Sequence, residues 1–215
     1  MNIEILGTQH IKDAATLIAQ SFVNGEPLVS GLQIPFASFN KMCEEMVSQA
    51  VSQSMSFVAM ENFQMIGVLL VRKANQPLID KEKANEICPQ MGSIFQLLDT
   101  LEVNSIEFSH LHKENLVYLD MGACHPDWMG NGVVTDLLSH AMQEIALKRN
   151  FDIVAACTNK ISQQVLKKRY KPVQINEIVY SDFLYQGMYP FSHITSSLTA
   201  QLLYIPQSQL VIKAI

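Results

Sequence analysis

The sequence predicts a single domain of the α/β (α+β) class over residues 1–215. Three patterns lead to this prediction: an apolar run that enters a periodic helix through a glycine-bearing turn, a hairpin pattern upstream of it, and two amphipathic helical patterns before the hairpin. Hydrophobic residues make up 48% of the chain and charged residues 16%, a composition that supports a well-buried core. No repeat, low-complexity tract or linker divides the chain.

The residues before position 74 show the periods of helices and strands in alternation. Asn24-Gly25-Glu26-Pro27 ends the first helix, because glycine and proline interrupt a helical pattern. Glu61-Asn62-Phe63-Gln64 supplies the turn of the hairpin. The expected elements are an edge strand at 1–6, helices at 11–22 and 39–51, and paired strands at 56–60 and 65–72.

Residues 74–115 fit this alternation least, and we interpret them as an insertion between core strands. A helix is expected at about 94–101. The segment either covers a substrate site or elaborates the surface, and the sequence leaves both open. His110-Leu111-His112 lacks a third ligand nearby, so these histidines are interpreted as loop residues rather than metal ligands.

A strand, a helix, a strand and a further helix are expected after residue 115. The first strand is the apolar run at 116–123, and the second is the buried run from Phe151 to Cys157. Lys148 and Arg149 suit a helix end, and Asn150 is the expected stop. Thr158 or Asn159 can cap the last helix, which ends before Lys171-Pro172. The apolar stripe of the first helix consists of Val133, Val134, Leu137, Leu138, Ala141, Met142, Ile145 and Ala146.

The turn between the apolar run and this helix has the chemistry of an anion site. The first turn of a helix leaves N–H donors without internal partners, and the helix dipole adds partial positive charge there. A phosphate or pyrophosphate fits such a place, and glycines let the backbone come close to it. A plain β–α turn that needs a positive φ is the alternative. The expected backbone donors are Gly130, Asn131, Gly132, Val133 and Val134.

The stretch from Cys124 to Val134 resembles the acyl-coenzyme A loop of the GNAT acetyltransferase superfamily. That loop has a strand ending in Val-x-Pro, then Arg/Gln-x-x-Gly-x-Gly/Ala, then a helix. Here Pro126 follows the strand, and Gly130 and Gly132 are the central glycines. Met129 stands where arginine or glutamine is usual, and Val134 stands at a position that is usually small. These departures imply coenzyme binding that relies on the backbone donors and is weaker for lack of a side-chain donor.

The resemblance implies a GNAT-like domain with a mixed, mostly antiparallel, twisted sheet of about seven strands. Helices would flank the sheet, and its two central parallel strands would splay apart. It also implies acetyl-CoA as co-substrate, with the pantetheine arm lying in the gap between the splayed strands. The implied cofactor-binding residues are Met121, Gly122, Ala123, Cys124, Met129, Gly130, Asn131, Gly132, Val133, Val134 and Asn159.

A second resemblance points to the insect-type arylalkylamine N-acetyltransferases. Their Phe-x-x-x-Glu-Pro-Leu motif matches Phe22 through Leu28, and their Ser/Thr-x-x-x-Ser-Gln helix start matches Thr158 through Gln163. The resemblance implies that Glu26 is the general base, that Ser162 donates to the leaving group, and that Thr158 supports them. His125 is the reserve candidate for the base.

One expected catalytic group is missing from this sequence. The tyrosine that serves as general acid elsewhere in the superfamily aligns with Leu166, which has no proton to donate.

Composition argues against several other classes of function. The net charge is −5, and Lys167-Lys168-Arg169 is the only basic run, so no nucleic-acid partner is expected. We interpret that run as a solvated helix end, although it could also attract the distal phosphates of a coenzyme. The longest apolar run, 65–71, is too short to span a bilayer, and the N-terminus lacks the features of a signal peptide. The four widely spaced cysteines favour free thiols, no metal site and a cytoplasmic location.

The leading hypothesis is therefore transfer of an acetyl group from acetyl-CoA to the primary amine of a small molecule, either an arylalkylamine or a polyamine-like compound. One alternative is acetylation of a protein or peptide amine. A second alternative is a non-catalytic GNAT-fold module that binds coenzyme A or a partner. The sequence leaves the oligomeric state open, and a homodimer is among the states considered.

Overall fold

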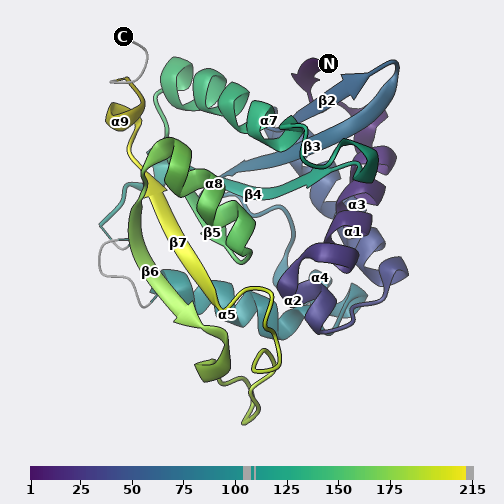
Figure 1. Ribbon diagram of the computed structural model, residues 1–215, viewed down its shortest axis with the longest axis vertical. Coiled ribbons are helices and arrows are strands. Elements are labelled where there is room, and N and C mark those ends of the chain that lie inside the picture. Colours follow the sequence, from purple (N-terminus) through teal and green to yellow (C-terminus); the bar gives the residue numbers. More distant parts are fainter. Residues whose placement is uncertain (104–107, 109, 212–215) are drawn as a thin grey trace.

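The computed structural model describes residues 1–103, 108 and 110–211, and Figure 1 shows a twisted sheet with helices on both faces. The sheet has seven strands in the order β1-β2-β3-β4-β5-β7-β6. All neighbouring strands are antiparallel except β4 and β5, which are parallel. The strands are β1 (Asn2–Ile5), β2 (Phe57–Glu61), β3 (Gln64–Lys73), β4 (Leu116–Cys124), β5 (Asp152–Cys157), β6 (Val173–Val179) and β7 (Thr199–Ile205).

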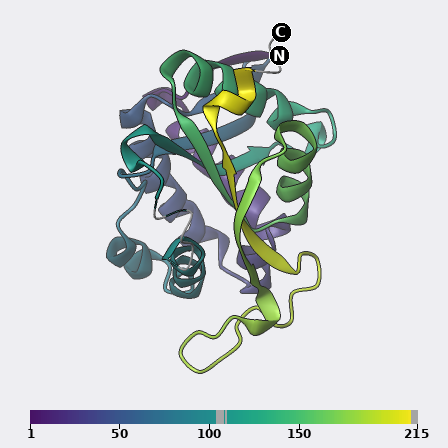
Figure 2. The ribbon, with the colours of Figure 1, turned by 90° about the vertical axis from the view of Figure 1, so that its left-hand side faces the viewer.

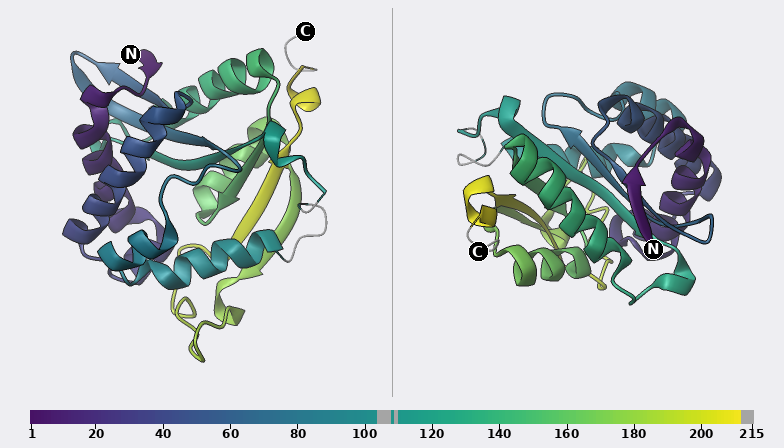
Figure 3. Two further views of the ribbon diagram at one scale, coloured as in Figure 1. Left: turned by 180° about the vertical axis from the view of Figure 1, so that it is seen from behind. Right: turned by 90° about the horizontal axis from the view of Figure 1, so that it is seen from above.

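Two groups of helices sandwich the sheet (Figures 2 and 3). On one face α1 packs on β3 and β4, α3 packs on β3, and α5 packs on β6 and β7. On the other face α7 packs on β2, β3 and β4, and α8 packs on β5 and β7. The helices are α1 (Ile11–Gly25), α2 (Pro27–Gly31), α3 (Phe36–Gln53), α4 (Lys81–Ile87), α5 (Met91–Val103), α7 (Val133–Ala141), α8 (Lys160–Tyr170) and α9 (Gln207–Val211), and a π-helical segment, Met142–Leu147, continues α7.

The strand and helix predictions drawn from periodicity are confirmed. The edge strand, the hairpin, both amphipathic helices and the strand–helix–strand–helix unit all form, within a few residues of the expected boundaries. Three short helices, α2, α4 and α9, were not predicted, because none is long enough to show a period. The residues of β6 and β7 were not assigned either; these strands were expected only within the sheet of about seven strands that the resemblance implies. Asn159 is the cap of α8, since its side chain accepts a hydrogen bond from the N–H of Ile161 at 2.8 Å.

The two parallel strands separate soon after they meet. β4 and β5 pair only from Leu116 to Tyr118, opposite Asp152 to Val154. A bulge then shifts the register of β4 on β3 at Asp120, and bulges bend the strand that carries them. From residue 119 to 124 no strand in the described part of the chain pairs with β4 on its β5 side. The splay implied by the resemblance is therefore present, and it leaves a strand edge open for hydrogen bonding.

Residues 74–115 contribute α4 and α5 to the helical layer that includes α1 and α3. The side chain of Asn176 on β6 donates to the carbonyl of Leu101 on α5 at 2.7 Å, so this segment is tied to the far end of the sheet. Its description as an insertion stays a prediction, and five of its residues, 104–107 and 109, lie outside the described residues.

Candidate active site

The glycine turn before α7 is open to solvent. Gly130 and Gly132 have φ values of +81° and +82°, the left-handed region that favours glycine, and Gly132 is the N-cap of α7. A Cβ added at either glycine would meet no atom within 4 Å. Met129, the neighbouring side chain, is 70% exposed. Neither Val134 nor another described segment closes this helix end.

The amides of the turn follow the expectation in part. The helix begins at Val133, and the N–H of Asn131 donates to the carbonyl of Trp128 at 3.2 Å. Asn131 was expected to be a free donor, and this expectation is wrong. In the described residues no backbone carbonyl accepts from Gly130, Gly132, Val133 or Val134. Four of the five predicted amides therefore remain available for an anion.

The start of α7 lies unusually close to the sheet. A Cβ at Gly67 on β3 would come within 2.5 Å of Cγ1 of Val133 and 3.1 Å of Cδ1 of Leu137. On β4, a Cβ at Gly122 would lie 3.3 Å from Cγ1 of Val134. Val134 thus packs on the face of β4 over a glycine, instead of reaching across the turn. Because Gly67 has no side chain, the start of α7 can pack directly on β3, and this close packing determines where the free amides of α7 lie.

His125 is engaged by its own loop. One ring nitrogen accepts from the N–H of Asp127 at 3.3 Å, and the other lies 3.2 Å from the side-chain amide of Gln64. Both nitrogens therefore have protein partners. This arrangement suits a residue that holds the loop, and the role of His125 as a reserve base stays a prediction.

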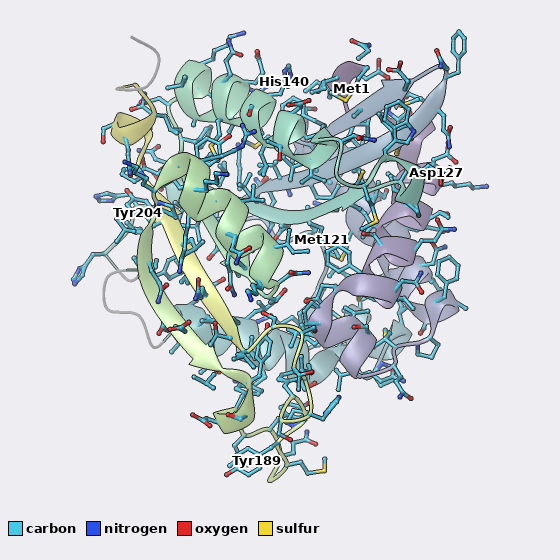
Figure 4. The ribbon with its side chains drawn as sticks, in the orientation of Figure 1. Met1, Met121, Asp127, His140, Tyr189 and Tyr204 are labelled. Atoms are coloured by element: carbon cyan, nitrogen blue, oxygen red, sulfur yellow. The ribbon has the colours of Figure 1, made fainter. Side chains whose placement is uncertain are left out.

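A cavity of about 190 Å³ lies where the splayed strands face α1, α3 and α5. The ends of β4 and β5 contribute Met121, Ala156 and Thr158, and Glu26 reaches it from the link between α1 and α2. Figure 4 shows Met121 near the middle of the molecule, beside β4. The other walls are mostly apolar and include Phe22, Leu28, Val29, Phe39, Met42, Met46, Leu78, Met91, Ile94, Phe95 and Leu98.

Glu26 is a buried carboxyl group with two donors. Its side chain accepts from the N–H of Val29 at 2.7 Å, which makes it the N-cap of α2, and from the hydroxyl of Thr158 at 2.7 Å. Burial in this apolar surrounding raises the pKa of Glu26, and the Val29 and Thr158 hydrogen bonds oppose that rise. Because burial is the larger effect, the carboxyl is shifted toward the range in which it can accept a proton from an amine.

Ser162 lies in the first turn of α8, four residues after Thr158, and its hydroxyl does not contact the Glu26 carboxyl group. Its hydroxyl donates to the carbonyl of Asn159 at 2.7 Å, and it is not part of the cavity wall. The structure therefore brings Glu26 and Thr158 together, from positions 132 residues apart, and leaves Ser162 outside the pair. Leu166 is buried among the apolar residues beneath α8.

Several polar residues of the cavity were missed by sequence reasoning, among them Arg72 and Asp120. Arg72 on β3 and Asp120 on β4 form an ion pair, with Nε 2.7 Å from the carboxylate, and the guanidinium lies 4.0 Å from the centre of the Tyr118 ring. Arg72 also donates to the carbonyls of Lys73 and Ala74. The one charged side chain in the apolar run 116–123 was the signal that could have identified Asp120.

The remaining predicted features lie away from the cavity. Lys167, Lys168 and Arg169 are exposed at the end of α8, and Lys167 donates to Gln174. His110 and His112 are exposed, and no group of three or more metal-ligating side chains occurs within the described residues. The four cysteines, all in the described part, are free thiols. Among the described helices none has the length and apolar character needed to cross a membrane.

A second, larger hollow of about 830 Å³ lies between α5 and the end of β6 with the residues that follow it. Its wall includes Gln96, Thr100, Glu177 and Asp182, and it contains none of the residues predicted from the sequence. We therefore place the candidate site at the smaller cavity, which lies beside the splayed strands and contains Glu26 and Thr158.

The splayed parallel pair, the bulge in β4, and the glycine turn leading into α7 define the GNAT fold. Comparison with solved structures agrees. The chain is similar to the C-terminal condensation domain of Ebony in complex with β-alanyl-dopamine, with a TM-score of 0.81 and 19% identity over 94% of this chain and 97% of that one. It is also similar to arylalkylamine N-acetyltransferase 2 from Aedes aegypti, with a TM-score of 0.78 and 19% identity over 96% and 98% of the two chains.

The polyamine N-acetyltransferase of Drosophila melanogaster, described as forming N-acetylagmatine, is similar as well. Its TM-score is 0.71, with 18% identity over 95% of this chain and all of that one. No protein-family model and no curated protein sequence matches the chain. The resemblance to insect arylalkylamine N-acetyltransferases is thus seen in three dimensions, at low sequence identity.

Proposed function

We propose that this protein transfers an acetyl group from acetyl-CoA to the primary amine of a small molecule. The observation that carries the proposal is the position of Glu26: a buried carboxyl with a raised pKa, in a small cavity that opens between splayed strands. The solved structures with this fold include enzymes described as arylalkylamine and polyamine N-acetyltransferases, which supports the same reaction class.

The residues at the turn and at the splay suit the donor. The free amides of Gly130, Gly132, Val133 and Val134 would hold the pyrophosphate of acetyl-CoA at the start of α7. The open edge of β4, from Met121 to Cys124, would pair with the amide groups of the pantetheine arm as a neighbouring strand does. Bound there, the coenzyme supplies the thioester carbonyl that is attacked.

Glu26 would act on the acceptor amine. An ammonium group has no lone pair, so it must lose a proton before its nitrogen can attack the carbonyl carbon. The Glu26 carboxylate would take that proton, directly or through water. The C–N bond then forms, the C–S bond breaks, and the departing thiolate takes up a proton. Ser162 stays our candidate for that last step, with Thr158 holding Glu26.

The cavity favours small acceptors over proteins. Its volume of about 190 Å³ and its walls of phenylalanine, methionine and leucine suit an arylalkyl or alkyl chain. The ion pair of Arg72 and Asp120 adds a polar place that could bind a second polar group of the acceptor. We therefore expect acceptors with an apolar body, and acetylation of a protein or peptide amine is the less favoured alternative.

Release of free thiol from acetyl-CoA tests the function directly. The assay uses the purified protein with a panel of arylalkylamines, diamines and polyamines, amino acids, and a peptide with a free N-terminus. Turnover with small amines and none with the peptide is the expected result. Turnover of the peptide but of no small amine would contradict the proposal and support acetylation of a protein or peptide amine. Binding of acetyl-CoA by calorimetry without turnover of any acceptor would indicate a non-catalytic module.

Substitution of Met129 tests the coenzyme site. Met129→Arg is expected to tighten acetyl-CoA binding by about two- to tenfold at low salt, because the exposed side chain lies beside the turn and a guanidinium can pair with phosphate. The gain should shrink as salt is added. Met129→Leu is the control and should leave the Kd unchanged. An equal Kd for Met129→Arg and the wild type in calorimetry would argue against a pyrophosphate at this turn.

A further inference from the structure

The peptide groups on both sides of the Thr158 Cα are held by side chains from outside β5. The side-chain amide of Gln163 donates to the carbonyl of Cys157 at 3.0 Å, and the hydroxyl of Tyr180 donates to the carbonyl of Thr158 at 2.5 Å. Gln163 also donates to the carbonyl of Thr199, at the start of β7, at 2.8 Å. The junction of β5 and α8 is therefore fixed at two successive carbonyls.

Both holding side chains are themselves buried and constrained. Gln163 is 8% exposed and Tyr180 is 1% exposed, and the Tyr180 ring packs against Phe191 with 5.9 Å between ring centres. Tyr180 comes from the end of β6, while Gln163 lies in the first turns of α8. Because both donating side chains are buried, their hydrogen bonds restrict the backbone at Thr158 more than bonds from exposed side chains would.

These contacts determine where the Thr158 hydroxyl points. That hydroxyl donates to Glu26 at 2.7 Å, and its direction depends on the backbone that Gln163 and Tyr180 hold. We propose that Tyr180 and Gln163 are positioning residues of the acetyl-transfer site, which keep the Thr158 hydroxyl on the Glu26 carboxylate. The inference rests on the proposed function, although the hydrogen-bond network can be tested without turnover.

Several other ionisable groups lie near Glu26, and burial also raises the pKa of one of them, Asp120. Tyr180 and Cys157 lie close to each other and to the junction, and burial raises the pKa of both, that of Cys157 to about 11. The charged residues that share the cavity with Glu26 are Arg72, Lys81, Asp99, Glu102 and Asp120. Arg72 is paired with Asp120, and Lys81 is paired with Asp99 at 2.5 Å.

Tyr180→Phe removes the hydroxyl and keeps the ring. Without this hydrogen bond the Thr158 carbonyl is free to move, and the Thr158 hydroxyl is expected to donate to Glu26 less of the time. The Glu26 carboxylate then loses a donor, and its pKa rises further. The acidic limb of the pH profile of kcat/KM should shift to higher pH. At neutral pH kcat/KM should fall by about two- to tenfold, with recovery at higher pH. The Kd for acetyl-CoA should stay unchanged.

Companion variants separate positioning from a general loss of stability. Thr158→Val removes the donor itself and should give a larger shift in the same direction, and adding Tyr180→Phe to it should change little more. Tyr204→Phe is the matched control, since Tyr204 donates to Asp152 at 2.7 Å near the other end of β7 (Figure 4). If Tyr180→Phe does not fold, Gln163→Leu tests the same junction.

Direct titration of the Glu26 carboxyl carbon by NMR, assigned with Glu26→Gln, gives a readout that needs no turnover. A higher midpoint in Tyr180→Phe and an unchanged one in Tyr204→Phe is the expected result. Turnover with an unmoved midpoint would overturn the positioning role and leave the transferase proposal standing. A higher Glu26 midpoint in Tyr180→Phe, without turnover of any acceptor, would support the contact of Tyr180 and Gln163 with the Thr158 junction and overturn the transferase proposal.

Discussion

Glu26→Gln is expected to lower kcat/KM for acetyl transfer at pH 7 by about a hundredfold or more, because removal of a general base costs roughly 10²–10⁴ in rate. The fold should be retained. The glutamine carbonyl can accept from the N–H of Val29, and its amide can donate to the hydroxyl of Thr158, so the cap of α2 survives. Calorimetry should show acetyl-CoA binding like that of the wild type.

The control for this substitution is Glu86→Gln, because Glu86 is exposed on α4, away from the cavity. It should leave kcat/KM unchanged. Comparable turnover by Glu26→Gln and Glu86→Gln would remove Glu26 from the mechanism, and the base would have to be sought elsewhere in the cavity.

The same substitution should change how stability depends on pH. The pKa of Glu26 is higher in the folded protein than in the unfolded chain, so between those two values the unfolded state releases this proton first. The contribution of Glu26 to stability is therefore full below the unfolded pKa and is lost as pH rises through the folded pKa. In thermal melts, the Tm of the Glu26→Gln variant relative to that of the wild type should rise as the pH increases above the ordinary pKa range of a glutamate. The opposite trend would mean that the carboxyl is stabilised in its charged form.

Gly67→Ala is expected to have the largest effect on folding. A Cβ at this position would approach Cγ1 of Val133 to 2.5 Å, and a valine on a helix in contact with the sheet has little room to turn away. Overpacking of this kind costs about 1–3 kcal/mol. Because the contact is at the first residue of α7, the helix start must move, and acetyl-CoA should bind more weakly as well.

Gly25→Ala is the matched control, since a Cβ there would meet nothing within 4 Å and the residue ends α1. It should be neutral or slightly stabilising in urea denaturation. If Gly67→Ala unfolds at the same urea concentration as the wild type and binds acetyl-CoA equally well, the close approach of α7 to β3 does not set the anion site.

Local sequence patterns were sufficient for the parts of the fold that depend on neighbouring residues. Gly130 and Gly132 adopt positive φ, and the helix after them forms, because backbone sterics and a 3.6-residue apolar period act within a few positions. The break at Glu26-Pro27 formed for the same reason. The strand before the turn was visible as an apolar run. The order of elements, and hence the GNAT resemblance, could therefore be predicted.

The site depended on contacts that no local pattern contains. Glu26 and Thr158 meet across 132 residues, and whether Glu26 is buried depends on how α1, α2 and α5 close over it. The same limit applies to Arg72 with Asp120 and to Tyr180 with Thr158, since each pair joins separate strands or loops. Ser162 fitted a motif, yet its hydroxyl bonds within its own helix turn.

The chain by itself determined the strand–turn–helix unit and the free amides at its centre, because glycine, proline and hydrophobic period act locally. Only the tertiary structure decided which carboxyl is buried, which hydroxyl donates to it, and where the parallel strands separate. Those properties arise when distant surfaces exclude water from one another, and burial then changes the proton affinity of Glu26 in a way its sequence neighbours do not show.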